Sequence, residues 1–161
     1  MNDTCVSSVI VNGSEHYYNF ALADVLFLRN YSQKCGYNFC SLIGGCESMR
    51  DIQQAKSLEA DSIECSYVES LFAYTKLHRG ITSLFKQDQQ LSNYPSIFLI
   101  IKTIRAAKVV PEILEYSKNQ PTQLDVIPVY DRRALIKSVH NLGHDNFDVS
   151  DLHYKVDDYI M

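Results

Sequence analysis

The sequence has no tryptophan and few of the residues that interrupt regular structure. Only six glycines and four prolines occur among its 161 residues, and we find no low-complexity segment and no internal repeat. Hydrophobic residues make up 46% of the chain and charged residues 21%, which is ordinary for a globular protein. The composition therefore predicts one domain with a real hydrophobic core.

Three other absences exclude classes of function. No apolar run reaches the roughly 18 residues that a membrane-spanning helix needs, and we see no signal-peptide core near the first residue. The formal charge of −4 comes without a basic run longer than Arg132-Arg133, so we expect no nucleic-acid partner. The five cysteines are odd in number and lack CxxC or CxxH spacing. We therefore expect free thiols in the cytoplasm and no structural zinc.

What the sequence does contain is a regular alternation of two patterns. Short apolar runs predict strands at Cys5–Val11, Phe39–Ile43, Ser62–Val68, Ile97–Ile101 and Leu124–Tyr130. Helical spacing predicts helices at Glu15–Lys34, Ser48–Leu58, Ser70–Leu77, Pro111–Tyr116 and Arg132–His140. The alternation predicts an α/β fold, in which consecutive βα units form a partial (β/α) barrel or a short parallel sheet.

Local signals add detail to this pattern. In the first helix, Phe20, Val25, Leu28 and Tyr31 are expected to form the stripe that packs on the sheet. Residues 82–96 are polar and predict an irregular connection. Proline at the first turn predicts the start of a helix at Pro111, and Pro128 predicts an edge strand or an irregular strand end.

Two segments follow the best predicted strands directly. Gly44 and Gly45 end the second strand, where glycines suit a sharp turn or a close backbone approach. Val68–Ser70 ends the third strand. Because sites in parallel sheets lie at the carboxyl ends of the strands, the sequence predicts a site at Gly44–Glu47 and Val68–Ser70.

These segments also carry a resemblance. Ile43–Glu47, Arg50–Ile52, Ala55-Lys56 and Val68–Ser70, in this order, resemble the aldolase/citrate lyase family. The match extends more weakly from about Val9 to about Asp148. The resemblance implies a (β/α)8 barrel that uses a divalent metal to make or break carbon–carbon bonds in keto-acids or acyl-CoA esters.

The chain is too short for a whole barrel of that kind, which needs roughly 200 to 250 residues. We expect a partial aldolase-like domain over residues 1–143 and an acidic, aromatic tail over residues 144–161. An incomplete barrel leaves strand edges and an apolar inner face that must be covered. The sequence therefore predicts a homo-oligomer or a subunit of a larger assembly.

Several positions depart from the family pattern that the resemblance implies. Lys102 stands where a metal-binding glutamate is expected, and Arg133 stands where an aspartate is expected. A shift of two residues would place Asp131 there instead. Leu42 stands where the resemblance implies a basic residue that contacts substrate, and an arginine expected near the end of the first unit falls near Ala21. Cations in place of metal ligands repel Mg²⁺ or Mn²⁺, so we expect a non-catalytic binding or assembly subunit without a cofactor.

The alternative is a working carbon–carbon lyase. Lys102 would then act as a Schiff-base nucleophile, with Glu47 and Glu69 as an acid/base pair, or those glutamates and Asp131 would hold Mg²⁺ or Mn²⁺. The simpler interpretation is that Glu47 and Glu69 charge the first turns of their helices and that Lys102 pairs with one of them.

A third interpretation needs no catalysis. Gly44, Gly45, Lys102 and Arg133 would bind a small anion such as a carboxylate or a phosphate.

Overall fold

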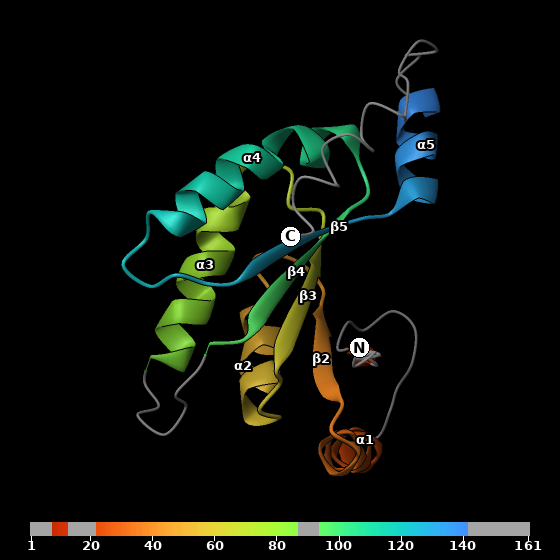
Figure 1. Cartoon of the computed structure of the whole chain (residues 1–161), viewed down its shortest axis with the longest axis vertical. Coiled ribbons are helices and arrows are strands. Elements are labelled where there is room, and N and C mark those ends of the chain that lie inside the picture. The colour runs from red at the N-terminus through yellow and green to blue at the C-terminus, as the bar shows by residue number, and fades with distance from the viewer. Residues whose placement is uncertain (1–7, 13–21, 87–93, 142–161) are drawn as a thin grey trace, which may run out of the picture.

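The computed structural model describes residues 8–12, 22–86 and 94–141, and its centre is one parallel sheet. The five strands lie in the order β1-β2-β3-β4-β5 (Figure 1). They are β1 (Ser8–Asn12), β2 (Asn38–Ile43), β3 (Ser62–Ser66), β4 (Ser96–Ile101) and β5 (Val126–Tyr130). All four pairings are parallel, which confirms the predicted α/β fold of consecutive βα units.

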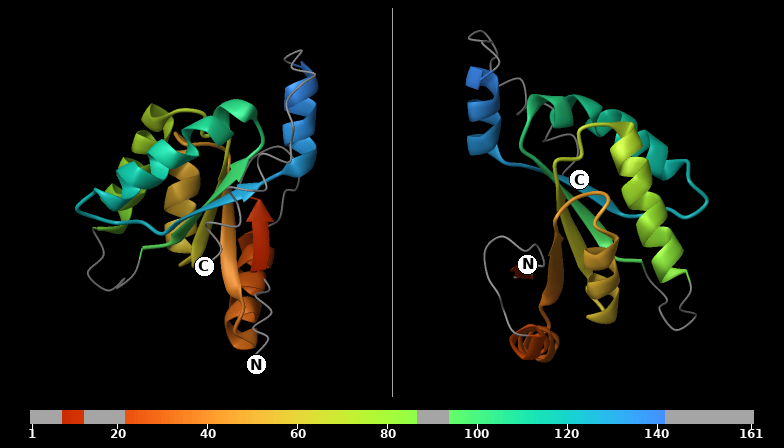
Figure 2. Two further views of the ribbon diagram at one scale, coloured as in Figure 1. Left: turned by 45° about the horizontal axis from the view of Figure 1, so that its top comes forward. Right: turned by 180° about the vertical axis from the view of Figure 1, so that it is seen from behind.

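A helix follows each strand. The helices are α1 (Leu22–Cys35), α2 (Met49–Ser57), α3 (Leu71–Phe85), α4 (Ile104–Lys118) and α5 (Arg132–Asn141). Every connection moves one strand in the same direction, and right-handed crossovers of that kind place their helices on one face of the sheet. Figures 1 and 2 show α2, α3 and α4 together on one side of the strands.

The core lies between these helices and the sheet. Alternate residues of the central strands point into it and are buried, among them Ile63, Cys65, Ile97, Leu99 and Ile101. The residues between them belong to the opposite face, where Leu42, Glu64, Phe98 and Ile127 lie side by side in register. Within the described ranges, no helix is packed against that face.

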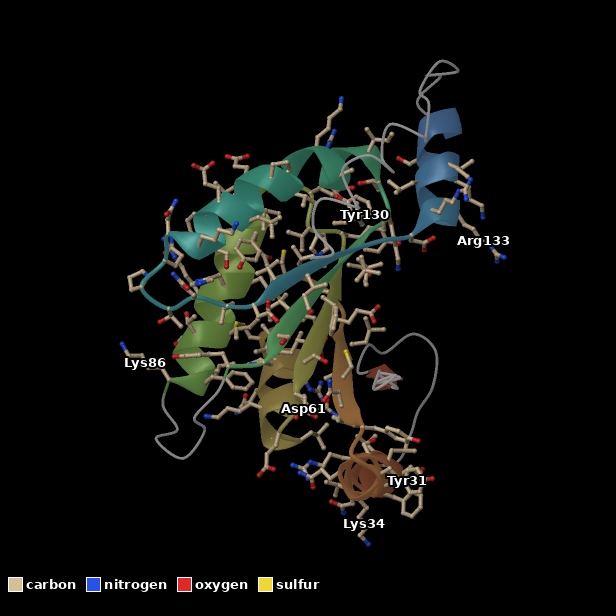
Figure 3. The ribbon with its side chains drawn as sticks, viewed as in Figure 1. Tyr31, Lys34, Asp61, Lys86, Tyr130 and Arg133 are labelled. Carbon is tan, nitrogen blue, oxygen red and sulfur yellow. The ribbon has the colours of Figure 1, made fainter. Side chains whose placement is uncertain are left out.

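The amino ends of three strands are held together by one residue. The Asp61 carboxylate accepts a hydrogen bond of 2.8 Å from the Phe39 N–H, and the Asp61 carbonyl accepts one of 3.1 Å from the Ser96 N–H. Figure 3 shows Asp61 at the lower end of the sheet. These bonds join the amino ends of the strands, and the carboxyl ends, where ligands bind in open parallel sheets, form the opposite edge.

Two predicted helices have different bounds in the structure. The helix predicted to end at Leu77 continues to Phe85, because Ile81 and Phe85 extend its buried stripe into residues expected to be irregular. Helix α4 begins at Ile104 and contains Pro111 in its interior, so the prediction that Pro111 starts a helix is wrong. Pro111 is exposed, while Thr103 caps the helix by accepting a hydrogen bond from the Ala106 N–H.

The prediction for α1 is wrong in one instructive respect. Val25 is buried as expected, but Tyr31 is 51% exposed. The buried positions of the helix include the polar residues Arg29 and Ser32. The Ser32 hydroxyl donates to the Leu28 carbonyl and the Arg29 guanidinium donates to the Leu58 carbonyl, so both are compatible with burial.

The prediction of an edge strand at Pro128 is confirmed, because β5 is the last strand of the sheet. Other predictions lie outside the described residues, including the start of the first strand, Phe20, Ala21 and the tail at 144–161. In the part of the chain that the structure describes, none of the helices combines the length and apolarity needed to cross a membrane.

Candidate functional site

Lys102 lies at the carboxyl end of β4, directly after Ile101. In β4, alternate residues face away from the helices, and Phe98, Ile100 and Lys102 follow this period. The Lys102 ammonium lies 5.4 Å from the centre of the Tyr67 ring, within the distance at which a cation is attracted to an aromatic face. Tyr67 follows β3, so two adjacent strand ends meet at this contact.

Glu64 lies on the same face of the sheet in the middle of β3. Its neighbours in register are Leu42 and Phe98, both half-buried and apolar. Burial raises the pKa of the Glu64 carboxyl, and the positive charge of Lys102 partly offsets this. A carboxyl with a raised pKa is thus within electrostatic reach of an ammonium group. We call Glu64, Tyr67 and Lys102 the Lys102 cluster.

The backbone of Tyr67 is strained. Its φ is 62°, a left-handed conformation that is rare for a bulky residue. Tyr67 is 62% exposed, so burial of this residue does not explain the strain. Strain of this kind is typical of functional sites. Here it holds an exposed aromatic ring over Lys102.

We predict that Tyr67→Gly stabilises the fold. Glycine adopts this φ without a steric penalty, so the free energy of unfolding should rise by about 1 kcal/mol, measured by urea denaturation. Tyr67→Ala is the matched control, because it removes the ring but keeps a Cβ in the strained conformation. Equal stability of the two variants would show that the backbone is not strained.

A second prediction concerns Glu64→Gln. The folded-state pKa of Glu64 is raised above its ordinary value of 4.5. As the pH rises, Glu64 therefore loses its proton in the unfolded chain before it does so in the folded chain. The stabilisation that protonated Glu64 gives the folded state is fully present below pH 4.5 and is lost as the pH rises through the folded-state pKa. Glutamine has no charge to bury, so Glu64→Gln should be more stable than the natural chain at pH 7.

The same measurement at low pH provides the control. Well below pH 4.5, Glu64 is protonated in both the folded and the unfolded chain, so the difference in unfolding free energy between Glu64→Gln and the natural chain should shrink. A difference that stays constant from pH 7 to pH 3 would contradict the raised pKa. Lys102→Met should lower the free energy of unfolding at pH 7, because it removes the positive charge that favours ionised Glu64.

Glu47 and Glu69 are both engaged by other residues of the chain. The Glu47 carboxylate forms an ion pair with Lys76 of α3. The Glu69 carboxylate accepts a hydrogen bond of 2.6 Å from the Thr103 hydroxyl and lies 4.0 Å from the Arg105 guanidinium. Each glutamate directly precedes the N-cap residue of a helix, which is Ser48 for α2 and Ser70 for α3.

The two glycines after β2, Gly44 and Gly45, lie at the turn into α2. The Gly44 N–H donates a hydrogen bond of 2.8 Å to the Asp51 carboxylate at the start of α2. A Cβ built on Gly45 would have no heavy atom within 4 Å, so packing does not require a glycine there. A turn is present, but we find no close backbone approach at Gly45.

Asp131 and Arg133 lie beyond the end of β5. The Asp131 carboxylate accepts a hydrogen bond of 3.0 Å from the Ala134 N–H, which caps α5. Arg133 is exposed on α5 and points away from the sheet (Figure 3). Among the residues that the structure describes, no three His, Cys, Asp or Glu side chains gather closely enough to hold a metal ion.

Of the Lys102 cluster, Lys102 is a candidate site residue in the sequence analysis, which makes no prediction for Glu64 or Tyr67. Glu64 had a usable signal, because it is a carboxylate in the middle of a strand that a parallel sheet should bury on both faces. The backbone conformation of Tyr67 left no signal in the sequence.

The fold and this cluster define the chain as an α/β protein with a singly wound parallel sheet and a basic residue at its carboxyl edge. No family model, no curated protein and no solved structure matches it. The resemblance to the aldolase/citrate lyase family therefore stays a prediction from its motifs.

Proposed function

We propose that this chain is an aldolase/citrate-lyase-like binding or assembly subunit that does not catalyse the family's reaction. One observation supports this proposal most directly. The carboxylates of Glu47, Glu69 and Asp131, the candidates for metal binding or acid/base catalysis, are each engaged by a different group of the chain's own. A metal would have to displace these partners to gain its oxygen ligands.

Lys102 is the residue to which a ligand would bind. Its ammonium group lies at the carboxyl edge of the sheet, and the Tyr67 ring covers one side of it. A small carboxylate bound there would accept charge-assisted hydrogen bonds from the ammonium. Glu64 would oppose the ligand by charge repulsion when ionised, so binding should strengthen as the pH falls and Glu64 takes up a proton.

A Schiff-base lyase is the second candidate, and the position of Glu64 favours it. The neutral Lys102 amine would attack the carbonyl carbon of a keto-acid, form a carbon–nitrogen bond and release the carbonyl oxygen as water. A protonated Glu64 would supply the proton that this departure needs. The raised pKa of Glu64 suits that role.

One experiment separates the two candidates. The chain is incubated with pyruvate, with and without borohydride, and its intact mass is measured. Pyruvate binding is followed in parallel by calorimetry, with and without Mg²⁺ or Mn²⁺. The binding proposal predicts a saturable heat of pyruvate binding and no covalent adduct. It also predicts that Lys102→Gln lowers the affinity for pyruvate at least tenfold.

Each outcome has a definite meaning. An adduct that is absent in Lys102→Gln would establish the Schiff-base lyase instead. Tight Mn²⁺ binding that Asp131→Ala removes would establish a metal enzyme. Lys108→Gln, an exposed lysine on α4, is the control. No heat with the natural chain, or equal heat with both lysine variants, would reject a ligand site at Lys102.

The assembly part of the proposal rests on the sheet face against which none of the described helices packs. Ile127 and Val129 of β5 are 37% and 40% exposed, and large apolar side chains on a sheet face favour association. We further propose that the protein works in the cytoplasm, where its free thiols stay reduced.

A further inference from the structure

Helix α1 carries its aromatic residues on the side that faces away from the sheet. Asp24, Phe27, Tyr31 and Lys34 are spaced by three, four and three residues, which places them in one line along the helix. All four are exposed. Val25, Arg29 and Ser32, on the other side of the helix, are buried. We call the line of four residues the α1 seam.

The aromatic pair at the middle of the seam is unusually open for a helix of a monomer. Phe27 is 68% exposed, and its ring stacks on the Tyr31 ring with the two centres 6.4 Å apart. Figure 3 shows Tyr31 and Lys34 on the outer side of α1, away from the strands. Tyr37, which follows the helix, is also exposed and enlarges the aromatic surface. Such a surface is typical of a protein–protein contact.

The order of residues in the seam is complementary to itself. Asp24 and Lys34 are its ends, Phe27 and Tyr31 are its centre, and both pairs have their midpoint at the level of Arg29. If a second α1 packs antiparallel about a twofold axis at that level, each Asp24 faces Lys34 of the other copy. Each Phe27 then faces Tyr31 of the other copy. A parallel arrangement would place like charges together instead.

We propose that the α1 seam is a homodimer interface, in which α1 of a second copy packs antiparallel against it about a twofold axis. The contact is isologous, because the same surface is used by both copies. Its centre is four aromatic rings, which supply apolar area and favourable ring contacts. Its ends are two ion pairs between Asp24 and Lys34, which fix the direction of the helices and exclude the parallel alternative.

The size of the seam sets the expected strength. A helix of 14 residues is about 21 Å long at about 1.5 Å per residue, so the interface is at the small end of specific contacts. We expect a reversible dimer with a dissociation constant of roughly micromolar order. The seam does not include the Lys102 cluster, so this inference stands independently of the proposed ligand.

Sedimentation equilibrium on the full chain over a range of concentrations tests the interface. The natural chain should show a monomer–dimer equilibrium. Phe27→Ser, which changes an exposed side chain, should remove the dimer and leave the far-UV circular dichroism unchanged. Lys34→Asp should weaken the dimer about tenfold or more, because it turns two ion pairs into two repulsions.

The direction of the helices is tested by exchanging the charges. Asp24→Lys should weaken the dimer as Lys34→Asp does, and the double variant with both changes should restore it. Lys108→Asp, on the exposed side of α4, is the control and should not change the dissociation constant. A natural chain that is monomeric at every concentration would overturn the proposal. So would a dimer that is insensitive to Phe27→Ser, or a double variant that is as weak as the single ones.

Discussion

Replacing Leu99 with alanine is expected to lower the free energy of unfolding by about 3 kcal/mol or more. Leu99 is 1% exposed in the middle of β4, and its neighbours in register are Cys65 and Pro128. Helices cover this side of the sheet, so the shortened side chain would leave a cavity that the strands cannot close. The change should appear as a lower midpoint in urea at an unchanged slope.

Val129→Ala is the matched control, because Val129 belongs to the other face of the sheet and is 40% exposed. Truncating it should cost less than about 1 kcal/mol. If both variants cost the same, the two faces are equally buried in solution, which contradicts the one-sided core. A Val129 cost that grows with protein concentration would instead show that this face is buried in an assembly.

The sheet could be predicted from the sequence because its signal is local. Phe39–Ile43 and Ile97–Ile101 are short apolar runs next to turn residues, and they match β2 and β4 to within a residue. The helix ends were harder. Burial of Ile104, Val110 and Ile113 outweighs the free-energy cost of placing Pro111 inside a helix. That burial depends on the sheet beneath α4.

The candidate site could be predicted from the sequence only in part, for a similar reason. Its location at the carboxyl ends of the strands follows from the βα order, and Lys102 is found there. The partner of Glu47 is Lys76 in the next helix, and this contact depends on how α3 lies beside α2. Neither the partner of a surface carboxylate nor a strained φ such as that of Tyr67 can be inferred from the residues nearby.

Helix α1 buries polar residues and exposes aromatic ones, and this arrangement has a direct consequence for stability. Arg29 lies on the buried side of the helix, where its Nε donates a hydrogen bond of 2.9 Å to the Leu58 carbonyl. Its guanidinium also pairs with the Glu59 carboxylate. This one side chain therefore ties α1 to the end of α2. Tyr31, which the sequence predicted to pack on the sheet, lies on the exposed seam instead.

Arg29→Met is expected to lower the free energy of unfolding by about 2 kcal/mol. Methionine fills similar space but cannot donate to the Leu58 carbonyl, which would be left in a buried environment without that donor. The ion pair contributes less, because the Glu59 side chain is 64% exposed and exposed pairs are worth about 1 kcal/mol at most. Urea denaturation of the variant and the natural chain provides the measurement.

Glu59 makes it possible to separate the hydrogen bond from the ion pair. Its φ is 49°, so Glu59→Gly loses the ion pair but relieves the left-handed backbone, and the two effects of about 1 kcal/mol each should nearly cancel. Glu59→Ala loses the pair without that relief and should cost about 1 kcal/mol. If Arg29→Met costs no more than Glu59→Ala, the buried hydrogen bond to Leu58 contributes nothing. A larger cost for Arg29→Met shows that α1 is held to the domain by its polar side, which leaves its aromatic side free for a second copy of the chain.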